Sequence, residues 1–160
     1  MRILDNMYIL YNNVIQGELN MLTINATKAR NEWSTLVESI IREKPAIIKR
    51  TRDYLFLSNI NVLENILAAY SFHAETFIEE DGSITISLDE IDLVENAPDI
   101  PGAISKLANA ILEYSEDYYN EFAYWSRGDR KIHIPYVFKA LILNDVNKIG
   151  GLIKCRRGKI

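Results

Sequence analysis

The chain has 160 residues, of which 48% are hydrophobic and 25% are charged, and its formal net charge is −4. This composition is typical of a globular protein and excludes a largely disordered one. The single cysteine, Cys155, excludes an internal disulfide framework, and the sequence carries no zinc-binding motif. No apolar run approaches the roughly 20 residues that cross a membrane. We therefore expect a cytoplasmic protein without a cofactor, built as one domain or as one small domain plus an extension.

Residues 1–20 lack the apolar core and the small-residue cleavage site of a secretory signal. The codons for residues 16–18 can form a purine run typical of a bacterial ribosome-binding site, just upstream of Met21. We hypothesise that translation starts at Met21 and that residues 1–20 are an over-extended start or disordered. The alternative is a short N-terminal helix or strand, and the intact mass of the natural protein decides between the two.

Residues 21–70 predict a small β-α-β-β-α module. The alternation in residues 22–24 indicates a short strand, and Asn25 is a suitable N-cap for a helix that Pro45 ends. Two β-prone runs, residues 46–48 and 54–57, are joined by a basic turn, and a second helix follows to about residue 70. The apolar stripe of the first helix is Ala29, Trp33, Leu36, Val37 and Ile40. Because so small a module buries little surface, we expect its core to be completed by a homodimer or larger assembly, by the C-terminal half, or by both.

Basic residues are concentrated in this module. Between residues 28 and 52 there are seven basic residues and three acidic ones, a balance that favours phosphate backbones. The candidate DNA contacts are Lys28 and Arg30 in the first turns of the helix and Arg50 and Arg52 at the hairpin tip. Two alternatives remain open: Arg30 forms a surface ion pair with a glutamate of its own helix, and the hairpin arginines are simply solvated.

The same stretch resembles the Phd/YefM family of antitoxins. The matching segments are Ile24-Asn25-Ala26-Thr27-Lys28-Ala29-Arg30-Asn31, Lys44-Pro45 and Ile47-Ile48-Lys49-Arg50. The resemblance implies a dimeric operator-binding domain that represses its own operon, with Arg30 and Arg50 at the DNA. Asn31, beside Arg30 in the matching segment, is a further candidate DNA contact. The chain departs from the family pattern in its turn, where Thr51-Arg52-Asp53 replaces an Asn-Gly or glycine-containing sequence.

Residues 74–160 predict an acidic β-hairpin followed by helices, with a boundary near residues 68–74. Asp81-Gly82 between two alternating runs is a strong hairpin signal. A long amphipathic helix is predicted over residues 99–125, a polar loop over 126–131 and another helix over 135–143. Asn144 is the expected cap of a last helix, which Gly150-Gly151 interrupts before a basic tail. The whole chain is therefore predicted to be of the α+β class.

Acidic residues dominate this second half, with thirteen acidic residues and one basic residue between residues 75 and 121. An acidic surface suits a basic partner, and the order of hairpin, acidic loop and helix is similar to HicB-type antitoxins. The candidate partner-binding residues are Glu79, Glu80, Asp81, Asp89, Asp92, Glu95, Glu116 and Asp117. A solvated acidic face is the alternative. A divalent-cation site at residues 89–95 and stacking of Tyr118, Tyr119, Tyr124 and Trp125 on nucleic-acid bases are also compatible with the residues present.

These patterns together predict an antitoxin of a type II toxin-antitoxin system that neutralises a toxin protein and represses its own operator. No nucleophile motif, metal-ligand motif or phosphate-binding loop indicates an enzyme. The alternative is a folded protein-interaction module that keeps the antitoxin fold without binding DNA.

Overall fold

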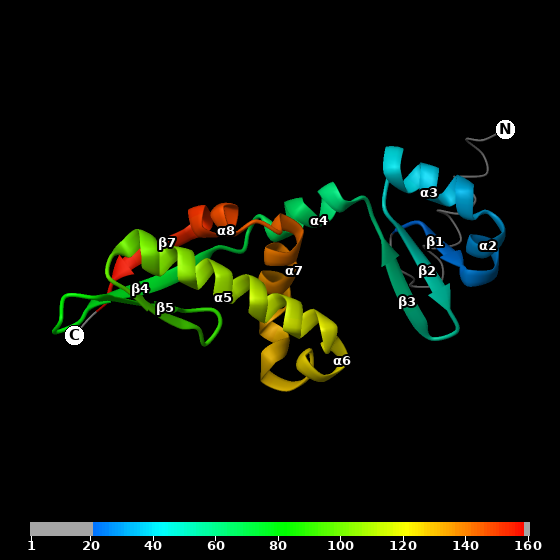
Figure 1. The fold of residues 1–160 in the computed structure, drawn as a ribbon. Helices are drawn as coiled ribbons and strands as arrows, with labels where there is room; N and C mark the ends of the chain where they lie inside the picture. The colour runs from blue at the N-terminus through cyan, green and yellow to red at the C-terminus, as the bar shows by residue number, and fades with distance from the viewer. Residues whose placement is uncertain (1–20, 159–160) are drawn as a thin grey trace. The chain divides into compact units, whose positions relative to one another are not determined.

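The computed structural model describes residues 21–158, so the hypothesis about residues 1–20 lies outside the described part of the chain. The architecture is α+β, as the sequence predicts, and the chain divides between Leu63 and Glu64 into an N-terminal unit and a C-terminal unit (Figure 1). The division falls inside α4 (Ile60–Leu67), which leads from one unit into the other. Within residues 21–158, no helix combines the length and apolar character needed to cross a membrane.

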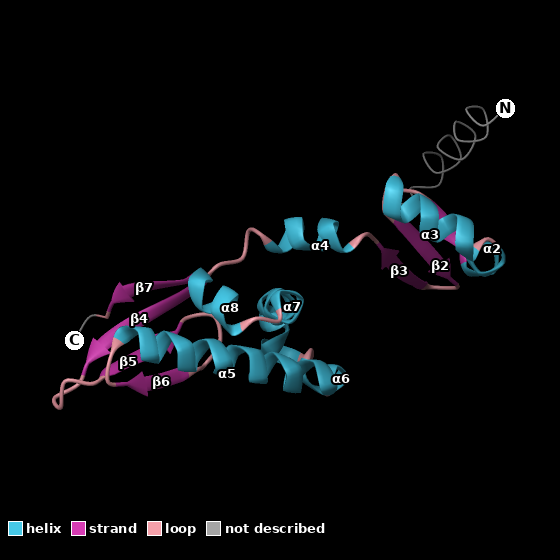
Figure 2. Cartoon of the chain, turned by 45° about the horizontal axis from the view of Figure 1, so that its top comes forward, coloured by secondary structure: helices cyan, strands magenta, loops and turns pink. Residues whose placement is uncertain are grey.

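The N-terminal unit is a three-stranded sheet with two helices on one face. Strand β1 (Thr23–Asn25) is parallel to β2 (Ala46–Arg50), and β2 is antiparallel to β3 (Asp53–Leu57). A tight turn cannot join parallel neighbours, so α2 (Ala26–Asn31) and α3 (Trp33–Arg42) form the connection (Figure 2). The buried contacts between helices and sheet come from Ala29, Leu36, Ile40, Ala46 and Ile48.

The single helix predicted between Asn25 and Pro45 is wrong, because the helix breaks at Glu32. The backbone of Glu32 leaves the helical region (φ −112°, ψ 27°), and its N–H donates to the carbonyl of Lys28 at 3.0 Å. Asn31 is a weak helix former, and the break after it rotates α3 relative to α2. Trp33, which the sequence places on the apolar stripe of a single helix, is 52% exposed.

The C-terminal unit contains a four-stranded sheet in the order β6-β5-β4-β7. The predicted hairpin is confirmed as β4 (Phe72–Ile78) and β5 (Ile84–Leu88), with Gly82 at φ +84° in its turn. The short edge strand β6 (Val94–Ala97) was not predicted, because its Val-Glu-Asn-Ala sequence has no strong β pattern. The basic tail was also not predicted to be a strand, but residues 153–157 form β7 (Ile153–Arg157), which pairs parallel with β4.

Five helical segments connect β6 to β7. They are α5 (Ile100–Asn120), α6 (Phe122–Trp125), the 3₁₀ helix η1 (Gly128–His133), α7 (Ile134–Leu143) and α8 (Val146–Leu152). The Asp99 carboxylate caps α5 by accepting the N–H of Gly102 at 2.7 Å. The predicted helix over residues 99–125 is therefore confirmed to Asn120 and then interrupted at Glu121.

The end of the chain differs from prediction in its caps. Asn144 does not cap the last helix; it adopts φ +42° and ends α7. The cap of α8 is Asp145, whose carboxylate accepts the N–H groups of Asn147 and Lys148. The helix then continues through Gly150 and Gly151 instead of breaking there, and ends at Leu152, just before β7. The predicted cap, Asn144, lies one residue before the observed cap, Asp145, because Asn and Asp are both favourable at the N-cap of a helix.

Helix α5 forms the centre of the C-terminal core. It lies along one face of the sheet and packs against α7 and α8 on its other sides (Figure 2). Its buried residues recur every three or four positions, which keeps them on one side of the helix. They are Ala103, Leu107, Ala108, Ile111, Ser115 and Tyr118. On the sheet, Phe72 and Ile86 are fully buried beneath them.

This packing predicts the effect of a cavity at the helix–sheet contact. Ile111→Ala should lower the free energy of unfolding of the C-terminal unit by about 2–5 kcal/mol, because Ile111 is fully buried. Denaturant titration followed by Trp125 fluorescence in a Trp33→Phe background measures it. Ile132→Ala, at a side chain that is 64% exposed, is the control and should cost less than about 0.5 kcal/mol. Equal losses in the two variants would contradict the assignment of the core.

Candidate nucleic-acid interface

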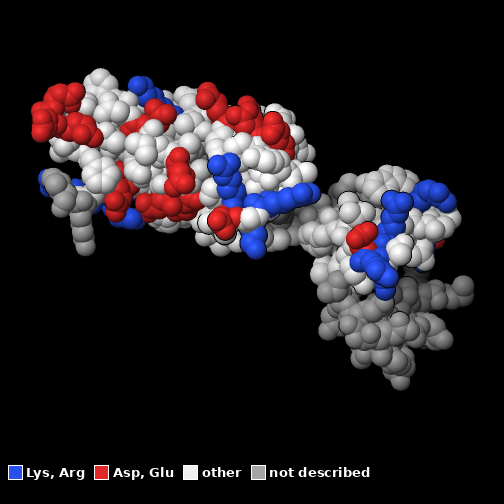
Figure 3. Space-filling model, turned by 90° about the horizontal axis from the view of Figure 1, so that it is seen from below, with Lys and Arg blue, Asp and Glu red and all other residues white. Residues whose placement is uncertain are grey.

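The start of α2 and the β2–β3 hairpin together form an open groove of about 550 Å³ on the N-terminal unit. Three of the predicted DNA contacts, Lys28, Asn31 and Arg50, line it. The remaining lining residues are Asn25, Ala26, Thr27, Glu32, Lys49 and Thr51. Residues separated by about twenty positions in the chain are thus gathered into one largely cationic, polar surface. In Figure 3, the charged side chains visible on this unit are mostly basic.

Two local features hold the walls of the groove in place. On one wall, the Asn25 amide oxygen accepts the N–H of Lys28 at 2.8 Å, so Asn25 caps α2 as predicted. On the other wall, Thr51 has φ +55°, a left-handed conformation that is costly for a β-branched residue. The register pairs Arg50 with Asp53, which confines the turn to Thr51 and Arg52. The hairpin is therefore tight despite lacking the glycine that such turns favour.

The other two predicted DNA contacts lie outside this groove. Arg30 lines a separate hollow with Ala26, Ala29, Trp33 and Ile48. It forms no ion pair within residues 21–158, and Glu38, one of its candidate partners, pairs with Arg42 instead. Arg52 occupies the exposed hairpin tip and is not among the groove residues. The structure thus brings together Lys28, Asn31 and Arg50 and leaves Arg30 and Arg52 beside them.

Sequence reasoning missed Lys49, Thr27 and Thr51 as groove residues. The Lys49 ammonium lies 5.7 Å from the ring centre of Tyr54 on the neighbouring strand, within the range of a cation–π contact. The sequence signal that could have identified Lys49 as a groove residue is its position directly beside Arg50. Glu32 also lines the groove and adds the one negative charge to it, which lowers the local positive potential.

The predicted acidic partner-binding residues occupy separate places on the C-terminal unit. Glu79, Glu80 and Asp81 form the exposed tip of the β4–β5 hairpin, where hydrogen bonds from Ser83 lower the pKa of the Asp81 carboxyl. Glu116 and Asp117 are exposed near the far end of α5. In Figure 3 the acidic side chains accordingly form several groups instead of one continuous surface.

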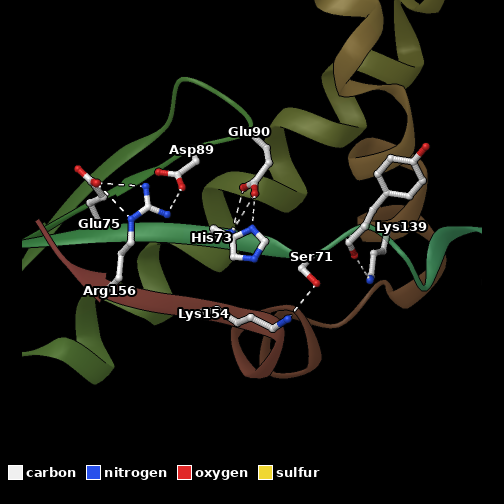
Figure 4. A network of polar contacts seen from close by, with 9 residues as sticks. Ser71, His73, Glu75, Asp89, Glu90, Lys139, Lys154 and Arg156 are labelled. Atoms are coloured by element: carbon white, nitrogen blue, oxygen red, sulfur yellow. Dashed lines mark hydrogen bonds and ion pairs between the residues drawn. The ribbon is translucent and has the colours of Figure 1, made fainter.

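The remaining acidic candidates lie near the open face of the sheet and its edge. Asp89 is held by Arg156, whose guanidinium donates to Asp89 at 2.7 Å and to Glu75 at 3.1 and 3.2 Å (Figure 4). Asp92 is exposed in the β5–β6 loop, and Glu95 is half-buried on β6. Asp89 is therefore already neutralised within the unit, by a residue of the tail that the sequence left unpaired.

Beside this ion pair, Glu90 accepts hydrogen bonds from the backbone N–H of His73 and contacts its Nδ1 at 2.7 Å (Figure 4). Two of the acidic residues that the sequence offered for a divalent cation, Asp89 and Glu90, are thus engaged in contacts within the unit. Across residues 21–158, the structure has no cluster of three or more histidine, cysteine or acidic side chains able to hold a metal ion. The open sheet face is thus held by internal ion pairs and hydrogen bonds.

Comparison with known proteins adds the family. A family model for antitoxins of toxin-antitoxin systems of the RelE/RelB type matches residues 21–155. The chain belongs to this antitoxin family. A crystal structure at 1.80 Å of an antitoxin from Syntrophomonas wolfei subsp. wolfei is similar over 86% of this chain and 100% of that one, with 35% sequence identity and a TM-score of 0.81. No curated protein gave a match. Within this broader family, the Phd/YefM and HicB resemblances remain predictions.

A half-buried tyrosine–histidine contact predicts that the stability of this antitoxin depends on pH. The Tyr114 hydroxyl lies 2.7 Å from His133 Nδ1, and burial lowers the pKa of His133 below its usual 6.5. The unfolded chain therefore binds a proton more readily than the folded one, so stability should fall as the pH drops below about 6.5. Denaturant titrations of wild type and His133→Gln between pH 8 and 5 measure the difference, and the variant should show the smaller loss. An equal loss in both proteins would assign the pH dependence to other groups.

Proposed function

We propose that this antitoxin is a transcriptional autorepressor whose N-terminal unit binds its operator DNA and whose C-terminal unit captures the toxin. The observation that supports the DNA-binding role is the groove, which gathers Lys28, Asn31 and Arg50 from a helix and a hairpin. Lysine and arginine neutralise phosphates, and the planar arginine fork can also hold a guanine edge with two hydrogen bonds. Asn31 adds an amide that can donate and accept at a base edge.

The arginines outside the groove extend the proposed footprint. Arg52 projects from the hairpin tip, and Arg30 lies on the adjoining face of α2, so each can meet a phosphate that flanks the groove. Contacts to phosphates position a protein on the duplex, while contacts to base edges specify the sequence. We therefore assign Arg30 and Arg52 to positioning, and Asn31 and Arg50 to reading the operator.

A homodimer would double these contacts and match a palindromic operator. The supporting observation is the apolar character of the sheet edge, where Tyr54, Leu55 and Phe56 of β3 are each at least half exposed. Edge strands with exposed apolar side chains favour pairing with another chain. This dimeric arrangement and the operator-binding arginines are what the Phd/YefM resemblance implies.

The toxin-binding role is assigned to the C-terminal unit because its acidic groups lie on a folded surface. An antitoxin has a toxin as its partner, and charge complementarity favours a basic one. Asp89 is bound to Arg156, while the exposed Asp92 and the half-buried Glu95 stay candidates beside two acidic groups. One is the hairpin tip at Glu79, Glu80 and Asp81, and the other is the end of α5 at Glu116 and Asp117.

The DNA-binding role predicts a loss of affinity when the groove loses its cations. The double variant Lys28→Ala/Arg50→Ala should weaken binding to the protein's own upstream DNA in a band-shift assay. It should also reduce the slope of log K against log salt by about 1.8 per protomer, at about 0.9 for each phosphate contact. Arg42→Ala/Lys44→Ala removes the same charge from the same unit outside the groove and should bind as wild type does.

A third variant separates charge from fold. Asn25→Asp keeps the helix cap but places a carboxylate in the groove, so it should fold normally and bind DNA less well. If the wild type gives no band shift at low salt, the repressor role is wrong and the alternative stands, a folded interaction module that does not bind DNA.

The toxin-binding role predicts that charge reversal disrupts copurification with the protein of the neighbouring gene. Glu79→Lys/Glu80→Lys tests the hairpin tip, and Glu116→Lys/Asp117→Lys tests the end of α5. At least one of these variants should lose the partner on coexpression, while Glu38→Lys/Glu43→Lys in the N-terminal unit should retain it. Retention of the partner by both C-terminal variants would show that acidic complementarity does not drive capture.

A further inference from the structure

The segment that joins α5 to α7 carries basic and aromatic side chains that the roles above do not use. It contains α6 and η1, residues 122–133, and we call it the α6–η1 segment. Its basic side chains are Arg127, Arg130 and Lys131, set within a unit that is otherwise acidic. On the underside of the C-terminal unit, where α6 lies in Figure 1, Figure 3 shows a group of basic side chains around a single acidic one.

These cations differ from most other basic side chains of the unit in their lack of partners. Lys106, Lys139, Lys154 and Arg156 each donate to a carbonyl, hydroxyl or carboxylate oxygen within the unit. Within residues 21–158, the side chains of Arg127 and Lys131 make neither a hydrogen bond nor an ion pair, although Asp129 lies between them in the chain. Ion pairing within the unit therefore does not account for Arg127 and Lys131.

The same segment exposes an aromatic surface. Tyr124 is 73% exposed, and its ring meets the indole of Trp125 edge to face at 5.8 Å. The guanidinium of Arg130 lies 4.3 Å from the ring centre of Trp125 and covers one face of the indole. An exposed phenol ring thus stands next to an indole–guanidinium stack.

Hydrogen bonds from α5 hold this surface in one conformation. The buried Tyr118 donates its hydroxyl to the carbonyl of Arg130 at 3.0 Å, and Tyr114 contacts both His133 and the Trp125 ring. Because the backbone is already ordered, a ligand would not have to order this segment on binding. The arrangement therefore resembles a preformed site more than a solvated loop.

We propose that the α6–η1 segment binds single-stranded nucleic acid, with a base stacked on Tyr124 and phosphates held by Arg127 and Lys131. Exposed aromatic rings flanked by cations suit unpaired bases, because every base offers a π-face while the cations follow the backbone. Duplex bases are already stacked and offer no free face to Tyr124. An acidic polypeptide would use the cations but has no need of an exposed ring.

The test uses the full chain with Trp33→Phe, which leaves Trp125 as the only tryptophan. Oligo-dT and oligo-rU of about ten nucleotides, within the usual site sizes for single strands, are titrated while Trp125 fluorescence is recorded. We expect quenching with salt-dependent affinity, and comparison of the two oligonucleotides separates DNA from RNA as the source of the strand. No change in fluorescence at low salt, and none in the anisotropy of a labelled oligonucleotide, overturns the proposal.

Variants assign the binding to these residues. Tyr124→Ala should weaken binding about tenfold or more, whereas Tyr124→Phe keeps the ring and should bind as wild type does. Arg127→Ala/Lys131→Ala should reduce the salt slope by about 1.4, at about 0.7 per phosphate of a single strand. Lys148→Ala/Arg157→Ala removes two other exposed cations of the same unit and should leave the slope unchanged. If this control loses as much binding as Arg127→Ala/Lys131→Ala does, the assignment of binding to the α6–η1 segment is wrong.

Two further arms separate this proposal from its competitors. Lys28→Ala/Arg50→Ala should bind the oligonucleotides normally, because the groove of the N-terminal unit is a different surface. Loss in that variant would transfer single-strand binding to the operator groove and overturn the inference without affecting the repressor role. Poly-glutamate that binds as tightly as the oligonucleotides and quenches Trp125 would instead identify an acidic polypeptide as the ligand.

Discussion

The parallel pairing of β4 with β7 is the interaction on which the C-terminal unit depends. It joins Phe72 to Ile153 across more than half the chain, so the five helical segments between β6 and β7 must pack back onto the sheet. That return places α5 over the sheet and against α7 and α8, which closes the core. It also brings Arg156 between Glu75 and Asp89, and Lys154 beside Ser71 (Figure 4). A parallel pair gains its hydrogen bonds only after the long connection is ordered, so the sheet and helices form as one cooperative unit.

The same pairing changes how the charges of this antitoxin are interpreted. In the sequence the acidic middle and the basic tail appear as two separate blocks, each available to a partner. In the structure part of each block neutralises the other, because Arg156 lies opposite Glu75 in the register of the sheet. The charges that remain unneutralised after folding are the more informative ones. Within residues 21–158 they include Lys28 and Arg50 of the N-terminal groove, the acidic hairpin tip and the end of α5, and Arg127 and Lys131 of the α6–η1 segment.

The two units also differ in how complete their cores are. The C-terminal unit buries Phe72, Ile86, Leu107 and Ile111 fully, whereas the N-terminal unit leaves Trp33 and the β3 side chains half exposed. A three-stranded sheet with two short helices has too little apolar surface to bury these residues by itself. Its exposed edge and its basic groove therefore fit a unit that functions in association with other molecules. The core of the C-terminal unit is complete within the unit, and its charges lie on the surface around that core.

Local pattern determined much of this protein by itself. The α+β class, the Asn25 cap, the hairpin at Asp81-Gly82 and the helix that begins after Asp99 follow from signals within a few residues, because caps and tight turns depend on nearby backbone groups. The basic residues at the helix start and the hairpin tip indicated Lys28 and Arg50 as DNA contacts, and the family pattern, which links a helix to a hairpin, also includes Arg50. Tertiary structure alone decided that Arg30 lies outside the groove, that Glu32 breaks the helix and exposes Trp33, and that the basic tail is a strand. Those outcomes depend on which face of an element meets its neighbour and on pairing between distant segments, neither of which leaves a periodic signal in a short stretch of sequence.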